Sequence, residues 1–389
     1  MTILVSFGSK KMLNKRLFSS IAQGRGGRHS DAGKSIAIFG ATGFLGRYVV
    51  NALGQTGWTV HLACRGDDME WRHLKPLMDY GKLIPHYYSA KDQDSVEAVI
   101  PKGKVDVVLN LIGKRYETKH LMPGVINNTY EDTHVKAAAA VAKAARRQGA
   151  KHLVHVSCAK ATLDSSSRWA KTKAQGELEA KREFPGAGIV RPGQMYGEED
   201  KFLNFFAIQG KMIPKVFPIV AGGEAKLRPV FVGDVASGIA SVVGDWQKYC
   251  GETVSLVGKD EYTVRQSVEY IFQTIGIERT LIDVDKNFAP LKLLATGLDK
   301  LPNPVLTPDM LEQWCLDDQP NKDGQLGWEA VGVKPHSFES KAYNFLFRYK
   351  AGGHFVELRK VEKSIGPAQV SHQLGQSQVT SRGPTPEHL

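Results

Sequence analysis

Short apolar runs alternate with longer segments of helical spacing from residue 34 onward. Runs rich in β-branched residues predict six strands, at 35–40, 59–64, 82–88, 106–113, 151–157 and 188–193. An alanine-rich segment at 132–150 has helical spacing and ends at Gly149. Strands that alternate with helices are typical of a parallel sheet with crossover helices, and strands that are apolar throughout are covered on both faces. The pattern therefore predicts an α/β fold built on a doubly wound parallel sheet.

The alternation becomes less regular after Gly193. Prolines and a Gly-Gly turn interrupt the segment 199–233, and a strand at 252–258 and a helix that ends at Gly276 follow. This second part predicts a smaller C-terminal lobe over the carboxyl edge of the sheet. From Ser364 the chain is polar and rich in Gln, Ser and Pro, so it cannot bury enough apolar surface to offset the entropy of ordering.

The first 30 residues differ in charge from the rest. The chain carries a net charge of +11, and residues 1–30 hold six Lys or Arg and no Asp or Glu. A basic, acid-free segment with serines and spaced Leu, Phe and Ile is typical of a mitochondrial transit peptide; a disordered basic terminus is the alternative. The remaining charge does not indicate nucleic-acid binding. The predicted parts of the chain are a leader at 1–33, a sheet domain at 34–255, a small lobe at 256–345 to which 194–215 contribute, and an extended or disordered tail at 346–389.

Membrane-spanning and metal-binding patterns are not found. No run reaches the roughly 18 to 20 apolar residues that a transmembrane helix needs. The four cysteines lie far apart and form no Cys-x-x-Cys pair, so they indicate neither a disulfide framework nor a zinc site. We expect no bound metal, and reduced thiols in a compartment such as the mitochondrial matrix.

A glycine-rich turn joins the first strand to the following helix in IAIFGATGFLGRYVVNAL. Gly40 permits a tight turn, Gly43 lets the backbone approach a pyrophosphate, and Gly46 lets the helix pack closely on the strand. The free N–H groups and the dipole of the helix attract phosphate. Because the turn opens the first βαβ unit, it predicts a Rossmann dinucleotide site rather than a turn without a ligand.

Arg65 ends the second strand, nineteen residues after Gly46. An NAD site usually has an acidic residue here for the ribose hydroxyls, whereas a 2′-phosphate requires a cation. A guanidinium presents a planar fork that suits phosphate oxygens. The sequence therefore favours NADP(H) over NAD(H); a solvated arginine beside Asp67 and Asp68 is the alternative.

The segment 165–177, SSSRWAKTKAQGE, has part of a catalytic pattern. In a large class of nicotinamide-dependent enzymes, a lysine holds the nicotinamide ribose, a serine orients the carbonyl and a tyrosine four residues before the lysine moves the proton. Here Ser157 ends the fifth strand and Lys173 follows one helix later, but Trp169 stands at the tyrosine position. An indole N–H is no acid in this range. Tyr116 and Tyr196 are possible substitutes, although neither precedes a lysine by four residues.

Six motifs in order resemble the atypical short-chain dehydrogenase family, and within it the branch found in mitochondrial respiratory complex I. The motifs are GATGFLG, LNLIGKRYETK, HVSCAKA, SSSRWAKTKAQGE, VRPGQMYGEEDKFLN and PVFVGDVASGI. The likeness extends from about Ser35 to about Phe347. Any one motif alone is weak evidence, but six in order are specific.

The resemblance implies a non-catalytic accessory subunit of NADH:ubiquinone oxidoreductase that holds NADP(H). Its partners would be other complex I subunits on the matrix side of the inner membrane near the quinone site, with peripheral contact to the membrane or its lipid and none to nucleic acid. Matched by position, the cofactor-binding residues are Gly40, Thr42, Gly43, Phe44, Leu45 and Gly46 at the phosphates, Arg65 at the 2′-phosphate, Leu111 and Ile112 on the ribose side, and Ser157, Lys173 and Pro192 at the nicotinamide end. Trp169 departs from the tyrosine of many members, which favours binding without catalysis.

Two other functions stay open on the sequence. The chain could be a free NADP-dependent reductase or epimerase acting on a small isoprenoid, lipid or sugar. It could also be a redox-sensing interaction protein of the same fold that associates with RNA. Co-migration with a large membrane complex would distinguish the subunit from both.

Overall fold

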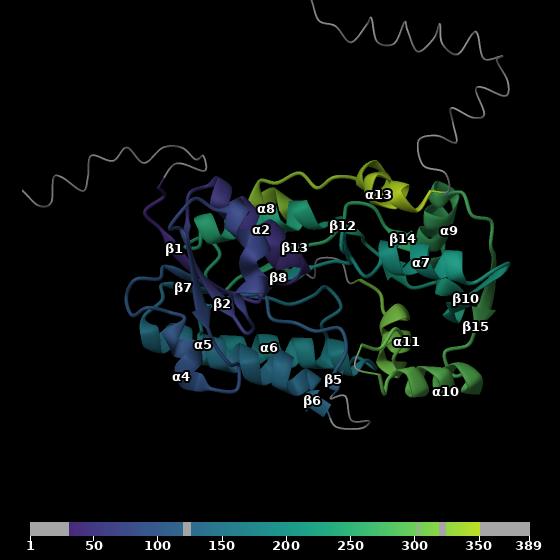
Figure 1. Cartoon of the computed structure of the whole chain (residues 1–389), viewed down its shortest axis with the longest axis horizontal. Helices are drawn as coiled ribbons and strands as arrows, with labels where there is room; N and C mark the ends of the chain where they lie inside the picture. Colours follow the sequence, from purple (N-terminus) through teal and green to yellow (C-terminus); the bar gives the residue numbers. More distant parts are fainter. Residues whose placement is uncertain (1–30, 120–125, 302, 319–323, 351–389) are drawn as a thin grey trace, which may run out of the picture.

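A parallel sheet of seven strands lies at the centre of the sheet domain (Figure 1). The structure is a computed structural model that describes residues 31–119, 126–301, 303–318 and 324–350. The strand order is β13-β8-β7-β4-β1-β2-β3. The strands are β1 (Ser35–Phe39), β2 (Thr59–Cys64), β3 (Leu83–Tyr87), β4 (Val107–Asn110), β7 (His152–Val156), β8 (Gly188–Pro192) and β13 (Thr253–Leu256). The order reverses between β1 and β4, so the predicted doubly wound fold is confirmed.

All six predicted strands form, and the strand predicted at 252–258 becomes the seventh, β13. The prediction for β4 was too long, because this strand ends at Asn110 and not at residue 113. The Ile112 backbone N–H donates to Asn110 Oδ1 at 3.0 Å. The amide side chain thus replaces a ladder partner, and the backbone leaves the sheet there.

Helices cover both faces of the sheet. One face carries α2 (Phe44–Gln55), α8 (Val232–Gly244) and α12 (Trp328–Val331), and the other carries α4 (Gln93–Ala98), α5 (Ala137–Gln148) and α6 (Arg168–Glu183) (Figure 1). Alternate residues of β1 enter the two cores: Ile36 and Ile38 pack in the core with α2, and Ala37 and Phe39 pack in the core with α5. The predicted alanine-rich helix ends at Gly149 as expected, with φ 74°. Its first turn, η2 (Glu131–Lys136), is π-helical.

The small lobe has its own aromatic core at one end of the molecule (Figure 1). It contains α7 (Leu203–Met212), β10 (Val216–Val220), α9 (Val264–Ile275), β15 (Thr280–Val284), α10 (Ala289–Leu298), α11 (Pro308–Trp314) and α13 (Phe338–Leu346). β10 and β15 pair in parallel. Residues 324–333 return to the sheet domain, where Leu326 bridges Val254 of β13 and α12 packs on α8.

Short elements connect these parts. They are α3 (Asp68–Trp71), η1 (Arg72–Leu77), β5 (Thr118–Lys119), β6 (Ile126–Asn128), β9 (Met195–Tyr196), η3 (Ala221–Gly223), β11 (Lys226–Leu227), β12 (Val230–Phe231), β14 (Tyr262–Thr263) and η4 (Phe347–Tyr349). Across the described residues, every helix is too short or too polar to cross a bilayer. The predicted leader and tail lie almost entirely outside the residues that the structure describes.

Candidate nucleotide-binding site

A cavity of about 410 Å³ lies where β1, β4, β7 and β8 end, between the sheet and the small lobe. Nine of the predicted cofactor-binding residues line it: Gly40, Gly43, Phe44, Leu45, Gly46, Leu111, Ser157, Lys173 and Pro192. The opposite wall comes from the small lobe and its connections, chiefly Phe202, Phe206, Leu227, Val264 and Trp314. Since the carboxyl ends of parallel strands meet at one edge of a sheet, residues far apart in sequence converge here.

The glycine turn leaves the start of α2 open to this cavity. Gly40 has φ +81°, and a Cβ there would lie 3.0 Å from the carbonyl carbon and oxygen of Leu111. A Cβ on Gly46 would lie 2.4 Å from the Ala41 carbonyl oxygen, so only glycine allows this approach of helix and turn. Within the described part of the chain, no side chain caps α2, whose N-cap residue is Gly43. Its first N–H groups therefore remain available to an anion.

Two buried polar groups at the other end of the cavity have no hydrogen-bond partner among the described residues. The Ser157 hydroxyl is 5% exposed and unpartnered. Lys173 is 7% exposed, and its ammonium makes no hydrogen bond or ion pair in the residues that the structure covers. Burial lowers the pKa of Lys173. Buried polar groups are normally hydrogen-bonded, so two orphans facing one cavity indicate a place for a polar ligand.

Trp169 has a structural role at the tyrosine position. Its indole N–H donates to the Lys114 backbone carbonyl at 2.8 Å, which fixes the loop after β4 against the start of α6. The backbone N–H groups of Arg168 and Trp169 donate to the carboxylate of Asp309 on α11, at 2.7 Å and 3.3 Å. Ser167 Oγ also contacts this carboxylate, at 3.1 Å. A side chain of the small lobe thus caps the helix that carries Lys173.

The two tyrosines considered as substitutes do not reach the cavity. Tyr116 donates to Asn303 Oδ1 at 3.0 Å on the surface. Tyr196 is fully buried in the core of the small lobe, where its hydroxyl donates to the Ser337 carbonyl at 3.4 Å and burial raises its pKa. Of the residues placed by the structure, none that lines the cavity is a tyrosine.

Sequence reasoning missed a group of cations in the cavity wall: Lys114, Arg115, Lys160 and Lys201. Burial lowers the pKa of Lys160 and brings that of Arg115 to about 10, which is still far above neutrality. The acidic lining residue Glu199 forms a bidentate ion pair with Arg47. The cavity therefore has an excess of positive charge and suits a polyanion. The basic pair four and five residues after the end of β4 was the available signal for the first two residues.

Three predicted residues lie outside this lining. Thr42 lies within the turn, and the Ile112 amide is occupied by Asn110. Arg65 is exposed at the end of β2. Burial is the main cause of the lowered pKa of Lys114, and the positive charge of Arg65 is close enough to lower this pKa further. Arg65 thus lies on the side of the cavity where Lys114 stands.

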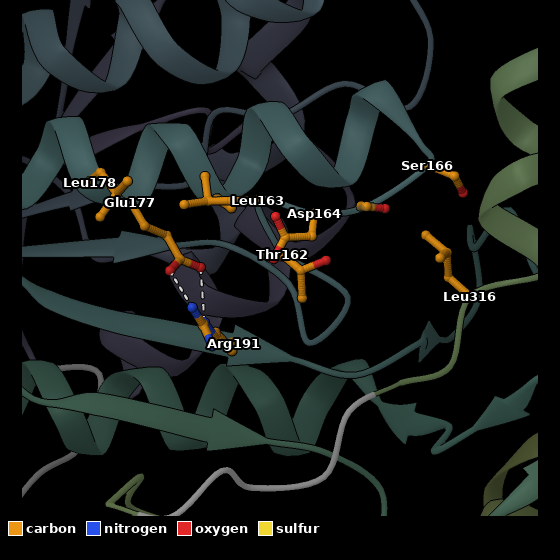
Figure 2. A pocket seen from close by; sticks show the side chains of 11 residues that line it. Thr162, Leu163, Asp164, Ser166, Glu177, Leu178, Arg191 and Leu316 are labelled. Atoms are coloured by element: carbon orange, nitrogen blue, oxygen red, sulfur yellow. Dashed lines mark hydrogen bonds and ion pairs between the residues drawn. The ribbon is translucent and has the colours of Figure 1, made fainter.

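A larger hollow of about 760 Å³ lies on another side of α6 (Figure 2). Arg191 and Glu177 face each other in it and satisfy each other, with Nε–Oε1 3.0 Å and Nη2–Oε2 2.6 Å. None of the unpartnered buried polar atoms found in the described residues belongs to its lining. Size alone therefore does not make this hollow the binding site. No cluster of His, Cys, Asp or Glu within the described residues is arranged to hold a metal ion.

The chain matches known proteins in sequence and in fold. The model of the NAD dependent epimerase/dehydratase family matches residues 36–248. The mitochondrial protein NADH dehydrogenase (ubiquinone) 1 alpha subcomplex subunit 9 of Arabidopsis thaliana is 32% identical over 354 residues, which cover 89% of this chain and 85% of the relative. Its namesake from Rattus norvegicus is 35% identical over 332 residues, covering 85% and 84%. The structure of dTDP-glucose 4,6-dehydratase from Bacillus anthracis in complex with NAD matches this chain with a TM-score of 0.57 at 15% identity. The match covers 81% of this chain and 96% of that one, and it shows a likeness of fold.

Proposed function

Because the chain belongs to the NAD dependent epimerase/dehydratase family, we propose that it binds NADP(H) as a non-catalytic accessory subunit of mitochondrial complex I. The relatives from Arabidopsis and rat, both named as subunits of NADH dehydrogenase (ubiquinone), support the complex. The observation that carries the nucleotide is a pair of unpartnered polar groups that line the cavity beyond the glycine turn: the buried Ser157 hydroxyl, and the ammonium of Lys173, a residue that is 7% exposed.

The residues present fit a dinucleotide. The open N-terminus of α2 would hold the pyrophosphate, and Lys173 and Ser157 would hold the nicotinamide end, where they would gain the hydrogen bonds that they lack. Arg65 and Lys114 would meet a 2′-phosphate, which favours NADP(H) over NAD(H). The excess of positive charge in the wall offsets the charge of the ligand.

A bound nicotinamide supplies a hydride donor or acceptor, but this chain lacks the matching proton donor. The indole of Trp169 is committed to the Lys114 carbonyl and cannot release a proton near neutral pH. General acid–base catalysis contributes about 10²- to 10⁴-fold to such reactions. The site thus favours retention of the nucleotide over its turnover.

The proposed setting is the matrix side of the inner membrane near the quinone site, with other complex I subunits and membrane lipid as partners and no nucleic acid. An apolar surface on and around α10 supports such contacts: Leu293 is 76% exposed, Leu294 56%, Phe288 51%, Val305 50% and Leu301 47%. Adjacent exposed side chains of this size are typical of an interaction surface.

Acid denaturation of the purified complex tests the proposal. We expect the subunit to co-migrate with a large assembly on native gels and to release close to one NADP(H) per chain. Recovery of mainly NAD(H), or of no nucleotide, refutes the NADP(H) site. A small soluble species that oxidises NADPH with a carbonyl substrate would instead indicate a free reductase or epimerase.

A further inference from the structure

The small lobe encloses a second cavity, of about 210 Å³, whose walls are apolar. It is bounded by α7, β10, α10 and α11, with Val264 of α9. Apart from the Gln209 amide and the Trp314 indole, every lining side chain among the described residues is a hydrocarbon. The deep part of the wall, which includes Phe217, Ile219 and Leu311, is at least 96% buried.

A cavity of this size and lining is suited to a hydrocarbon and not to water. Protein interiors contain few voids larger than a single water molecule. At roughly 30 Å³ for each water-sized group, the space holds about seven such groups. Among the described side chains, only Gln209 and Trp314 offer waters there a polar partner, whereas an apolar cavity of about 150 Å³ stays dry and accepts benzene.

The cavity lies between the nucleotide site and the surface. At its inner end, Phe206, Val264 and Trp314 line both this cavity and the nucleotide cavity. At its outer end, the lining residues Leu294 and Val305 are 56% and 50% exposed. The outer end is therefore continuous with the apolar surface of α10, and a chain that enters there is directed toward the nucleotide.

We propose that this cavity binds one hydrocarbon chain of an amphiphilic lipid, which enters between Leu294 and Val305 with its head group left outside. The inference deepens the proposed function, since it rests on the membrane contact proposed for the surface of α10. The lining among the described residues has no charged side chain to pair with a charged head, so only the chain is taken up. The volume of the space accommodates a segment of about seven groups rather than a whole lipid.

Binding of cis-parinaric acid to the full chain, purified with its nucleotide, tests this inference. We expect one probe to bind per chain. We also expect energy transfer from tryptophan to the probe, and its efficiency should fall in the variant Trp314→Phe, because this indole lines the cavity. Leu298→Trp fills the cavity and is expected to weaken binding at least about tenfold. Leu293→Trp is the matched control, because this residue is on the same helix but 76% exposed and outside the lining, and its affinity is expected to stay within about twofold of the parent.

Val305→Trp at the mouth is a second blocking variant, on a loop, in case Leu298→Trp does not fold. If decanoate displaces the probe and didecanoyl phosphatidylcholine does not, the chain comes from a free fatty acid. If both displace it, the chain comes from a membrane lipid. Either result supports the proposal. No saturable binding, or equal binding by blocking variants and control, overturns it. Nucleotide content is measured on the same samples. If the chain retains its nucleotide but does not bind the probe, only the lipid inference fails. If the chain binds the probe but contains no nucleotide, the NADP(H) proposal fails instead.

Discussion

Replacing Lys173 by methionine is expected to change the stability of the free protein and its hold on the nucleotide in opposite directions. The ammonium is buried without a hydrogen bond in the described residues, and burial lowers its pKa. A buried polar group left unsatisfied costs about 1–3 kcal/mol, and a charged one more. Methionine fills a similar space without charge. We therefore expect the free energy of unfolding of the nucleotide-free chain to rise by about 1–3 kcal/mol.

The same substitution removes a charged donor from the proposed nucleotide site. Such a hydrogen bond contributes about 1.5–3 kcal/mol, so the dissociation constant for NADPH is expected to rise about 10- to 150-fold. At a ligand concentration a hundred times the parent dissociation constant, NADPH stabilises the parent by about 2.7 kcal/mol. A variant that binds a hundredfold more weakly gains only about 0.4 kcal/mol from the same concentration. The nucleotide should thus lose most of its stabilising effect.

Urea unfolding with and without NADPH, together with calorimetric titration of NADPH, measures both effects. The matched control is Lys171→Met, which removes the same charge from the same helix at an exposed position and should change neither quantity. If Lys173→Met lowers the urea midpoint of the nucleotide-free chain and leaves NADPH affinity unchanged, the reasoning is wrong, and Lys173 is a structural residue of α6.

Three further predictions concern pH, the 2′-phosphate and the helix cap. Burial lowers the pKa of His61 and His152 to about 4 and that of His155 to about 3, while the unfolded chain protonates near 6.5. The stability that these groups contribute is then complete above pH 6.5 and falls by about 1.4 kcal/mol per pH unit for each histidine as the pH drops toward 4, so His152→Phe should reduce the slope by about 1.4 kcal/mol per pH unit; an unchanged slope in urea titrations contradicts this. Arg65→Glu is expected to weaken NADPH binding at least about tenfold and to spare NADH, and an equal loss for both would show that Arg65 does not meet the 2′-phosphate. Asp309→Ala is expected to cost about 1–2 kcal/mol and to speed amide hydrogen exchange at Arg168 and Trp169; unchanged exchange there would exclude the capping role.

The sheet was predictable from the sequence because both of its faces are buried. Full burial makes its strands continuous apolar runs, and glycines such as Gly149 end the helices between them. The end of β4 was not predictable from hydrophobicity, since it depends on the Asn110 side chain taking a backbone N–H from Ile112. That hydrogen bond is a local choice among several that an asparagine can make.

The part of the candidate site that lies on the sheet domain was predictable, because sequence motifs mark it. The part of the cavity wall that the small lobe supplies was not predictable. The glycine turn and the residues Ser157 and Lys173 follow strands of the sheet, so their convergence follows from the topology. The environments of Lys160 and Tyr196 depend instead on how the small lobe docks: one becomes part of the cavity wall and the other is buried in a separate core. Local sequence pattern carries no information about that docking.

The cap that Asp309 places on α6 also imposes an order on folding in time. Asp309 follows Ser167, the residue at the start of α6, by 142 positions. The entropy cost of closing a loop grows with its length, so a contact across 142 positions forms late, when α11 of the small lobe docks on the sheet domain. Before that docking, the N-terminus of the helix that carries Lys173 lacks this cap. Capture of the nucleotide in its final form therefore waits for α11, and a chain cut short before Asp309 would keep its glycine turn yet hold the nucleotide weakly.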